Sequence, residues 1–175
     1  MSGISQIQMS FVPLEDRILM RMSTLTSEGF QFWLTRRYVK LLWPLLLNML
    51  AKDSLVLLQQ SEDAKKEIMS FQQEEAARNM DFSQSFEDNF DSMPLGDKPV
   101  LLAKAGAKTS PEGAQVLSLH PESGQGIDIA LNQQLMHSLC KLLQDTVAKT
   151  DWDIDLARSL RTDVTQVSQQ PASIN

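Results

Sequence analysis

The 175-residue chain has one cysteine, one tyrosine and two histidines, and it has fewer basic than acidic residues. Its single cysteine, Cys140, excludes an intrachain disulfide. The 16 lysines and arginines against 22 aspartates and glutamates give a net charge of −6. This charge argues against unspecific binding of nucleic acid or of an anionic membrane by the whole molecule. We therefore expect a soluble, cytoplasmic protein.

Motifs for catalysis and for cofactor or metal binding are also missing. The sequence has no glycine-rich phosphate loop, no nucleophile elbow and no cluster of metal-ligating residues, and these patterns mark such sites. His137 falls at a helix position that we expect on the surface, and Cys140 at one that we expect in the core. We predict no enzyme activity, no cofactor and no metal site, and an unrecognised enzyme is the third alternative for the function.

Segments suited to a signal peptide or a membrane span are absent as well. The N-terminus has neither the basic nor the apolar region of a secretory signal. The longest apolar run, from Leu41 to Leu50, is interrupted by Pro44 and Asn48, and it is too short to cross a bilayer. We therefore expect no membrane partner.

Alternating apolar and polar residues predict three strands in the first 34 residues. The alternation runs through residues 4–11, 17–23 and 30–34, and half-buried strands have this period. Thr35 then suits the N-cap of a helix. Pro44 lies inside this helix, and we expect it to cause a kink.

The same order of elements recurs 97 residues later. Strands are predicted at residues 100–108, 114–120 and 127–131, and a helix capped by Asn132 runs to about Ala148. The match continues without a gap from the second strand into the helix. We predict an α+β fold in which two βββα repeats, related by a pseudo-twofold axis, form one antiparallel sheet packed by two helices.

The negative charge is concentrated between the repeats, because residues 54–97 carry ten acids against three bases. Such a composition rarely builds a core by itself. The predicted segments are a first repeat (1–53), a helical insertion (54–80), an acidic disordered linker (81–98), a second repeat (99–150), and a C-terminal segment with its tail (151–175).

The sheet face of the first repeat that is turned away from the helices combines basic and aromatic side chains. Arginines contact phosphates and an exposed indole offers a stacking platform, as in proteins that bind single-stranded nucleic acid. The alternative is that this face is buried against a second copy or under the middle helix. The predicted binding residues are Arg17, Leu19, Arg21, Gln31 and Trp33 on the face, with Arg36 and Arg37 at the start of the helix.

Three phenylalanines, Phe82, Phe86 and Phe90, occur in the acidic linker at intervals of four residues. They would share one side of a helix if the linker folded on binding. The segment is therefore either a plain linker or an acidic-aromatic docking motif. In the second case its target is a partner protein or the basic face of the first repeat.

Two resemblances add to this picture. The runs Asp16–Arg17, Phe32–Arg37 and Leu42–Pro44 resemble a family of uncharacterised proteobacterial proteins of similar length, which implies no function. The repeated order of strands and helix, with Gly126–Leu131 leading into the second helix, is similar to the Whirly and PUR-repeat proteins and implies binding of single-stranded nucleic acid. The acidic charge and the long insertion depart from that pattern.

From these observations we predict a non-catalytic cytoplasmic binding or adaptor module that acts through protein–protein contacts and forms a homo-oligomer. Binding of single-stranded DNA or RNA by the basic-aromatic face is the alternative.

Overall fold

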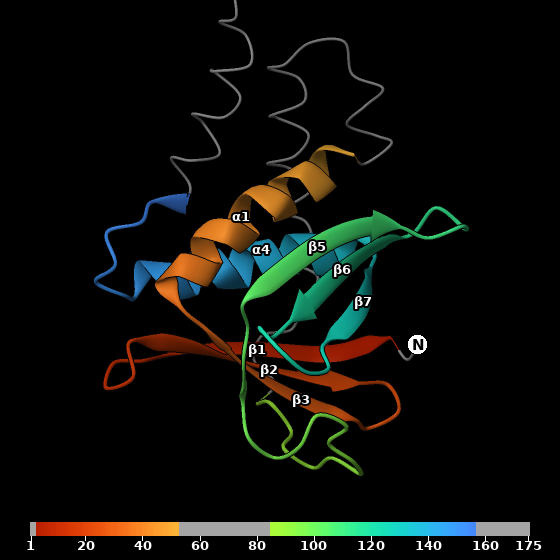
Figure 1. Cartoon of the computed structure of the whole chain (residues 1–175), viewed down its shortest axis with the longest axis horizontal. Coiled ribbons are helices and arrows are strands. Elements are labelled where there is room, and N and C mark those ends of the chain that lie inside the picture. The colour runs from red at the N-terminus through yellow and green to blue at the C-terminus, as the bar shows by residue number, and fades with distance from the viewer. Residues whose placement is uncertain (1–2, 53–84, 157–175) are drawn as a thin grey trace, which may run out of the picture.

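The computed structural model describes residues 3–52 and 85–156, and these ranges contain mixed α and β structure, as predicted. Within the described ranges, no helix has both the length and the apolar character that a membrane crossing requires. The elements in chain order are β1 (Ile4–Val12), β2 (Arg17–Thr24), β3 (Gly29–Leu34), α1 (Arg36–Ala51), β4 (Val100–Leu101), β5 (Lys104–Thr109), β6 (Gln115–His120), β7 (Ile127–Leu131) and α4 (Gln133–Ala148) (Figure 1).

The strands form two sheets, so the prediction of a single antiparallel sheet is wrong. Sheet 1 has the order β1-β2-β3-β4 and sheet 2 the order β5-β6-β7. β4 pairs in parallel with β3, whereas the other strand pairs are antiparallel. The physical reason lies at the edge of β3 that β2 leaves open. This edge is already bonded to Ser92, Leu101 and Leu102. A strand edge covered in this way cannot pair with a strand of the second unit.

Strict alternation places one set of side chains from β2 and β3 in the core. The side chains between them in sequence point to the opposite side of sheet 1, which we call the outer face. Burial of the inner set removes a continuous apolar surface from water. The buried cross-strand pairs are Ile18 with Leu34, Met20 with Phe32, and Met22 with Phe30.

Both helices begin where their caps were predicted. The Thr35 side chain accepts a hydrogen bond from the Tyr38 amide at 3.1 Å, and the Asn132 side chain accepts one from the Leu135 amide at 2.8 Å. Each bond satisfies one of the backbone donors that a helix start leaves without a partner. α1 continues through Pro44 to Ala51.

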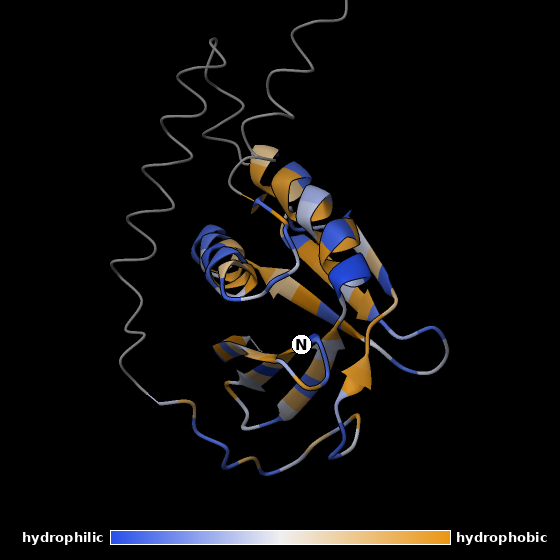
Figure 2. Cartoon of the chain, turned by 90° about the vertical axis from the view of Figure 1, so that its left-hand side faces the viewer, coloured by the Kyte–Doolittle hydropathy of each residue, from blue (hydrophilic) through white to orange (hydrophobic). Residues whose placement is uncertain are grey.

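The helices pack across the two units. α1 lies against β5, α4 lies against β1, and the two helices contact each other. Hydrophobic and hydrophilic residues alternate along both helices (Figure 2), as expected for helices with one buried side. A single core therefore joins both sheets and both helices.

α4 is buried over a wider arc than the sequence pattern indicated. Cys140 is 1% exposed, as predicted, but His137 is 3% exposed, so the expectation of a surface histidine is wrong. The reason is that α4 contacts β1, β7 and α1, and these neighbours cover more than one side of the helix. Lys40, which corresponds to His137 in the first repeat, is exposed on α1.

Several predictions fall on residues that the structure does not describe. The helical insertion at 54–80, Phe82 and the tail from residue 162 lie outside the described residues. For the C-terminal segment, the alternation of Trp152, Ile154 and Leu156 with aspartates predicts a short edge strand or the start of a short helix that runs through Arg161. Residues 151–155 form no strand, Leu156 is helical, and residues 157–161 lie outside the described residues. Trp152 in this segment is nevertheless buried.

Candidate binding face of sheet 1

The outer face of sheet 1 brings five of the predicted binding residues together. Leu19 pairs directly with Trp33 across β2 and β3, and Arg21 pairs with Gln31. All four side chains are half-buried. Arg17 completes the group, because its guanidinium carbon lies 4.8 Å from the centre of the Trp33 ring and the side chain forms an ion pair with Glu15.

Arg36 and Arg37 do not belong to this face. They form the exposed first turn of α1, and Arg36 lines a hollow beside the β1–β2 turn together with Pro13 and Asp16. The structure therefore divides the predicted binding residues between the outer face and the start of a helix.

A segment from the acidic region lies on the outer face. Residues 85–92, which we call the covering segment, run below sheet 1 on the side away from the helices (Figure 1). The Phe86 ring lies 4.8 Å from the guanidinium carbon of Arg21, and an Asp88 carboxylate oxygen is 2.5 Å from the same guanidinium. The Glu87 amide donates a hydrogen bond to the Gln6 side chain at 3.3 Å. Arg21 is thus the centre of these contacts.

Phe90 packs where sheet 1 has no side chain. A Cβ atom at Gly29 would lie only 2.5 Å from the Phe90 ring, so the ring occupies the space that any other residue would fill. Phe90 also contacts Phe86 edge to face, with 5.9 Å between the ring centres. Neither phenylalanine is in a helix. Both lie on the first repeat of their own chain, one of the two targets that the sequence suggested.

The end of the covering segment is held differently from its beginning. The Asp91 amide donates to the Ser27 carbonyl at 2.8 Å, and the Gly29 amide donates to the Ser92 carbonyl at 2.9 Å. No backbone–backbone hydrogen bond joins residues 85–90 to the rest of the described chain. This first part is held on sheet 1 by side-chain contacts and by the hydrogen bond from the Glu87 amide to the Gln6 side chain.

The other half of the outer face is not covered by these contacts. Leu19, Trp33 and Leu101 are direct neighbours across β2, β3 and β4, and we call them the Trp33 row. Leu101 is 48% exposed. The row therefore presents adjacent apolar groups on a face of sheet 1 that neither α1 nor α4 covers (Figure 1).

Sheet 2 carries a charged group that the sequence did not reveal. Lys108 approaches an Asp128 carboxylate oxygen to 2.5 Å, and the other oxygen lies 3.6 Å from His120. The Lys108 hydrogen bond, followed by that from Ser118, holds the pKa of the Asp128 carboxyl below its usual value. Ser118 and His120 lie two residues apart on β6, and Lys108 joins them through the pairing of β5 with β6.

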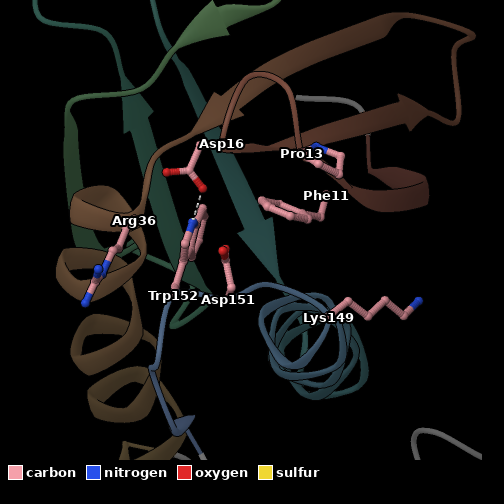
Figure 3. A pocket seen from close by; sticks show the side chains of 7 residues that line it. All are labelled: Phe11, Pro13, Asp16, Arg36, Lys149, Asp151 and Trp152. Atoms are coloured by element: carbon pink, nitrogen blue, oxygen red, sulfur yellow. Dashed lines mark hydrogen bonds between the residues drawn. The ribbon is translucent and has the colours of Figure 1, made fainter.

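A hollow of about 480 Å³ lies between the β1–β2 turn and the segment after α4 (Figure 3). The Trp152 indole donates a hydrogen bond to Asp16 at 2.6 Å and meets Phe11 edge to face. The Arg36 and Lys149 side chains point away from each other (Figure 3), so they do not converge on one ligand. The hollow is best explained by the packing of Trp152.

Among residues 3–52 and 85–156, no group of three or more histidines, cysteines, aspartates or glutamates could hold a metal ion. Comparison with protein-family models, with curated proteins and with solved structures finds no match for this chain. The two resemblances stay predictions, and the function has to be argued from the outer face of sheet 1.

Proposed function

We propose that the protein is a non-catalytic, cytoplasmic binding or adaptor module, and that it binds another protein through the outer face of sheet 1. One observation carries this proposal: the Trp33 row places Leu19, Trp33 and Leu101 side by side on an accessible face. Protein interfaces are enriched in tryptophan and arginine at their centres. Arg17, which lies over Trp33, supplies the arginine.

Binding of single-stranded nucleic acid is the alternative function of the same face. The contact between Arg17 and Trp33 would suit a stacked base beside a phosphate. Both arginines of the face, however, are already paired with carboxylates, Arg17 with Glu15 and Arg21 with Asp88. This neutralisation lowers the attraction for phosphates and favours a protein partner.

We also infer that two copies of the βββα unit are related by a pseudo-twofold axis. The 97-residue shift places Arg36–Ala51 of α1 on Gln133–Ala148 of α4. Each helix packs against the first long strand of the other unit, α1 on β5 and α4 on β1. A superposition of the two units in an experimental structure tests this inference. A rotation far from 180° would contradict it.

A photo-crosslinking amino acid at Leu101 tests the protein-binding proposal. We expect crosslinks from Leu101 to a partner protein or to a second copy, because this side chain is the exposed end of the Trp33 row. Adding Trp33→Ala should lower the crosslink yield several-fold. The mass of the product separates a homo-oligomer from a complex with another protein.

The control places the same probe at Leu14, which is fully exposed in the β1–β2 turn and away from the Trp33 row. Equal yields from Leu14 and Leu101, or no product from Leu101, would contradict the proposal. A labelled single-stranded oligonucleotide is measured in parallel at low and moderate salt. Salt-sensitive binding that Trp33→Ala abolishes would favour the alternative function.

A further inference from the structure

We propose that the part of the outer face around Arg21 is a binding site for an acidic, phenylalanine-bearing peptide segment of a partner protein, and that the covering segment occupies this site in the free chain. The inference rests on the proposed function and names the chemistry of the partner. The Arg21 site consists of Gln6, Gln8, Arg21, Gly29 and Gln31.

The site is built to receive an aromatic ring and a carboxylate together. Gln8 accepts a hydrogen bond from the Arg21 Nε atom at 2.8 Å, and this bond orients the guanidinium on the face. Phe86 then lies over the guanidinium and Asp88 bonds to it. An arginine that contacts a ring and a carboxylate at once selects for both groups.

Gly29 supplies a second subsite for an aromatic ring. The missing side chain leaves a depression in which Phe90 lies. Gln31, the cross-strand partner of Arg21, is its next neighbour on the same face of β3. Phe86 and Phe90 occupy the two subsites with their ring centres 5.9 Å apart, so the site fits two phenylalanines four residues apart with an acid between them.

The covering segment is held weakly enough to be displaced. Its first part, residues 85–90, lacks backbone–backbone hydrogen bonds to the described chain, and the Asp88 side chain is 62% exposed. An exposed ion pair contributes little free energy. The bonds of Asp91 to the β2–β3 turn and of Ser92 to β3 can remain while residues 85–90 leave the site.

The chemistry of the site favours a peptide from another protein over the other possible occupants. The covering segment of a second copy is bound to its own β3 through Ser92 and β4, so it already has a site. Arg21 is the only cation of the Arg21 site, and its neighbours are neutral glutamines and a glycine. A nucleic acid strand needs a series of cations along its backbone.

Occupation by the covering segment should weaken binding of the external peptide, because only the fraction of molecules with an open site can bind. The probe is a fluorescein-labelled synthetic peptide with the sequence of residues 85–92, and its binding is followed by fluorescence polarisation. We expect the Phe86→Ala/Phe90→Ala chain to bind this peptide at least ten times more tightly than the natural chain.

A second variant opens the site without removing the phenylalanines. Asp88→Lys places a positive charge against Arg21 and should also raise the affinity for the peptide. Asp97→Lys makes the same change of charge at an exposed position outside the covering segment, and it should leave the affinity unchanged. Circular dichroism and urea unfolding confirm that each variant is folded.

Changes in the site itself complete the test. In the Phe86→Ala/Phe90→Ala chain, Arg21→Ala and Gly29→Ala should each reduce peptide binding at least tenfold, and a peptide with both phenylalanines replaced by alanine should not bind. The inference would be overturned if neither opened chain bound the peptide, or if Arg21→Ala left peptide binding unchanged. Preferential binding of a single-stranded oligonucleotide by the opened chains would overturn the class of partner.

The two proposals can fail separately. Crosslinks from Leu101 that depend on Trp33 support the proposed function whether or not the opened chains bind the peptide. If these crosslinks form but the opened chains do not bind the peptide, only the inference about the Arg21 site is contradicted.

Discussion

Cys140 is the only thiol of the chain, and it lies in the core with 1% of its surface exposed. Burial raises the pKa of this thiol to about 12, because the apolar surroundings disfavour the thiolate. The thiolate is the reactive form of cysteine. The residue therefore contributes to core packing. Because of the same burial, the stability of the fold depends on pH in the alkaline range.

We predict that the free energy of unfolding falls as the pH rises above about 9. The folded thiol keeps its proton up to about pH 12, whereas the unfolded thiol loses it near its ordinary pKa. Below the unfolded pKa, the neutral thiol makes its full contribution to the free energy of unfolding. This contribution is lost as the pH rises from the unfolded pKa to the folded pKa. The loss from this group is about 1.4 kcal/mol between pH 8 and pH 10.

Urea unfolding of the natural chain and of Cys140→Ala at both pH values measures this effect. The buried Tyr38 hydroxyl also has a raised pKa, but it is present in both chains and cancels in the difference. An equal loss of stability in both chains between pH 8 and pH 10 would show that the thiol titrates normally in the folded state.

The starts of α1 and α4 depend on their caps. Neither helix has an acidic residue in its first turn, so no side-chain charge complements the positive end of the helix dipole. The side chains of Thr35 and Asn132 are the groups that stabilise these two starts. The caps also mark the points where β3 and β7 end.

We predict that Thr35→Ala and Asn132→Ala each lower the free energy of unfolding by about 1 kcal/mol. The two losses should add, because each cap bonds within its own helix. Urea denaturation followed by circular dichroism measures them. Thr35→Ser keeps the hydroxyl and serves as the conservative control. A loss as large for Thr35→Ser as for Thr35→Ala would argue against the capping bond.

Trp152 connects the C-terminal segment to sheet 1 in the whole molecule. The indole is 2% exposed, it donates to Asp16 in the β1–β2 turn, and it packs edge to face on Phe11. Asp16 has a positive φ of 52°, a conformation that Asp and Asn tolerate better than most residues. This contact therefore joins the segment after α4 to β1 and the β1–β2 turn.

We predict that Asp16→Asn is nearly neutral, because the amide oxygen can still accept the indole proton and asparagine tolerates a positive φ. Asp16→Ala should lower the free energy of unfolding by roughly 1–2 kcal/mol, because it removes the acceptor and adds backbone strain. Thermal and urea unfolding compare the two variants. Equal stability of the Ala and Asn variants would show that the bond does not stabilise the fold.

The short elements of this protein could be predicted from local patterns. Alternation over a few residues identified β1, β2 and β3, and the cap chemistry of Thr35 and Asn132 placed the starts of both helices. These signals act between residues close in sequence, so they do not depend on the rest of the fold. The five face residues from Arg17 to Trp33 followed from the same alternation.

The tertiary structure decided what depends on contacts between distant segments. The occupied edge of β3 divides the strands into two sheets, and the packing of α4 against β1 buries His137. Lys108 reaches Asp128 only because β5 and β7 flank β6. Alternation showed which side chains share the outer face, but only folding could bring Phe86 and Asp88 to Arg21, because 65 or more residues separate them in sequence.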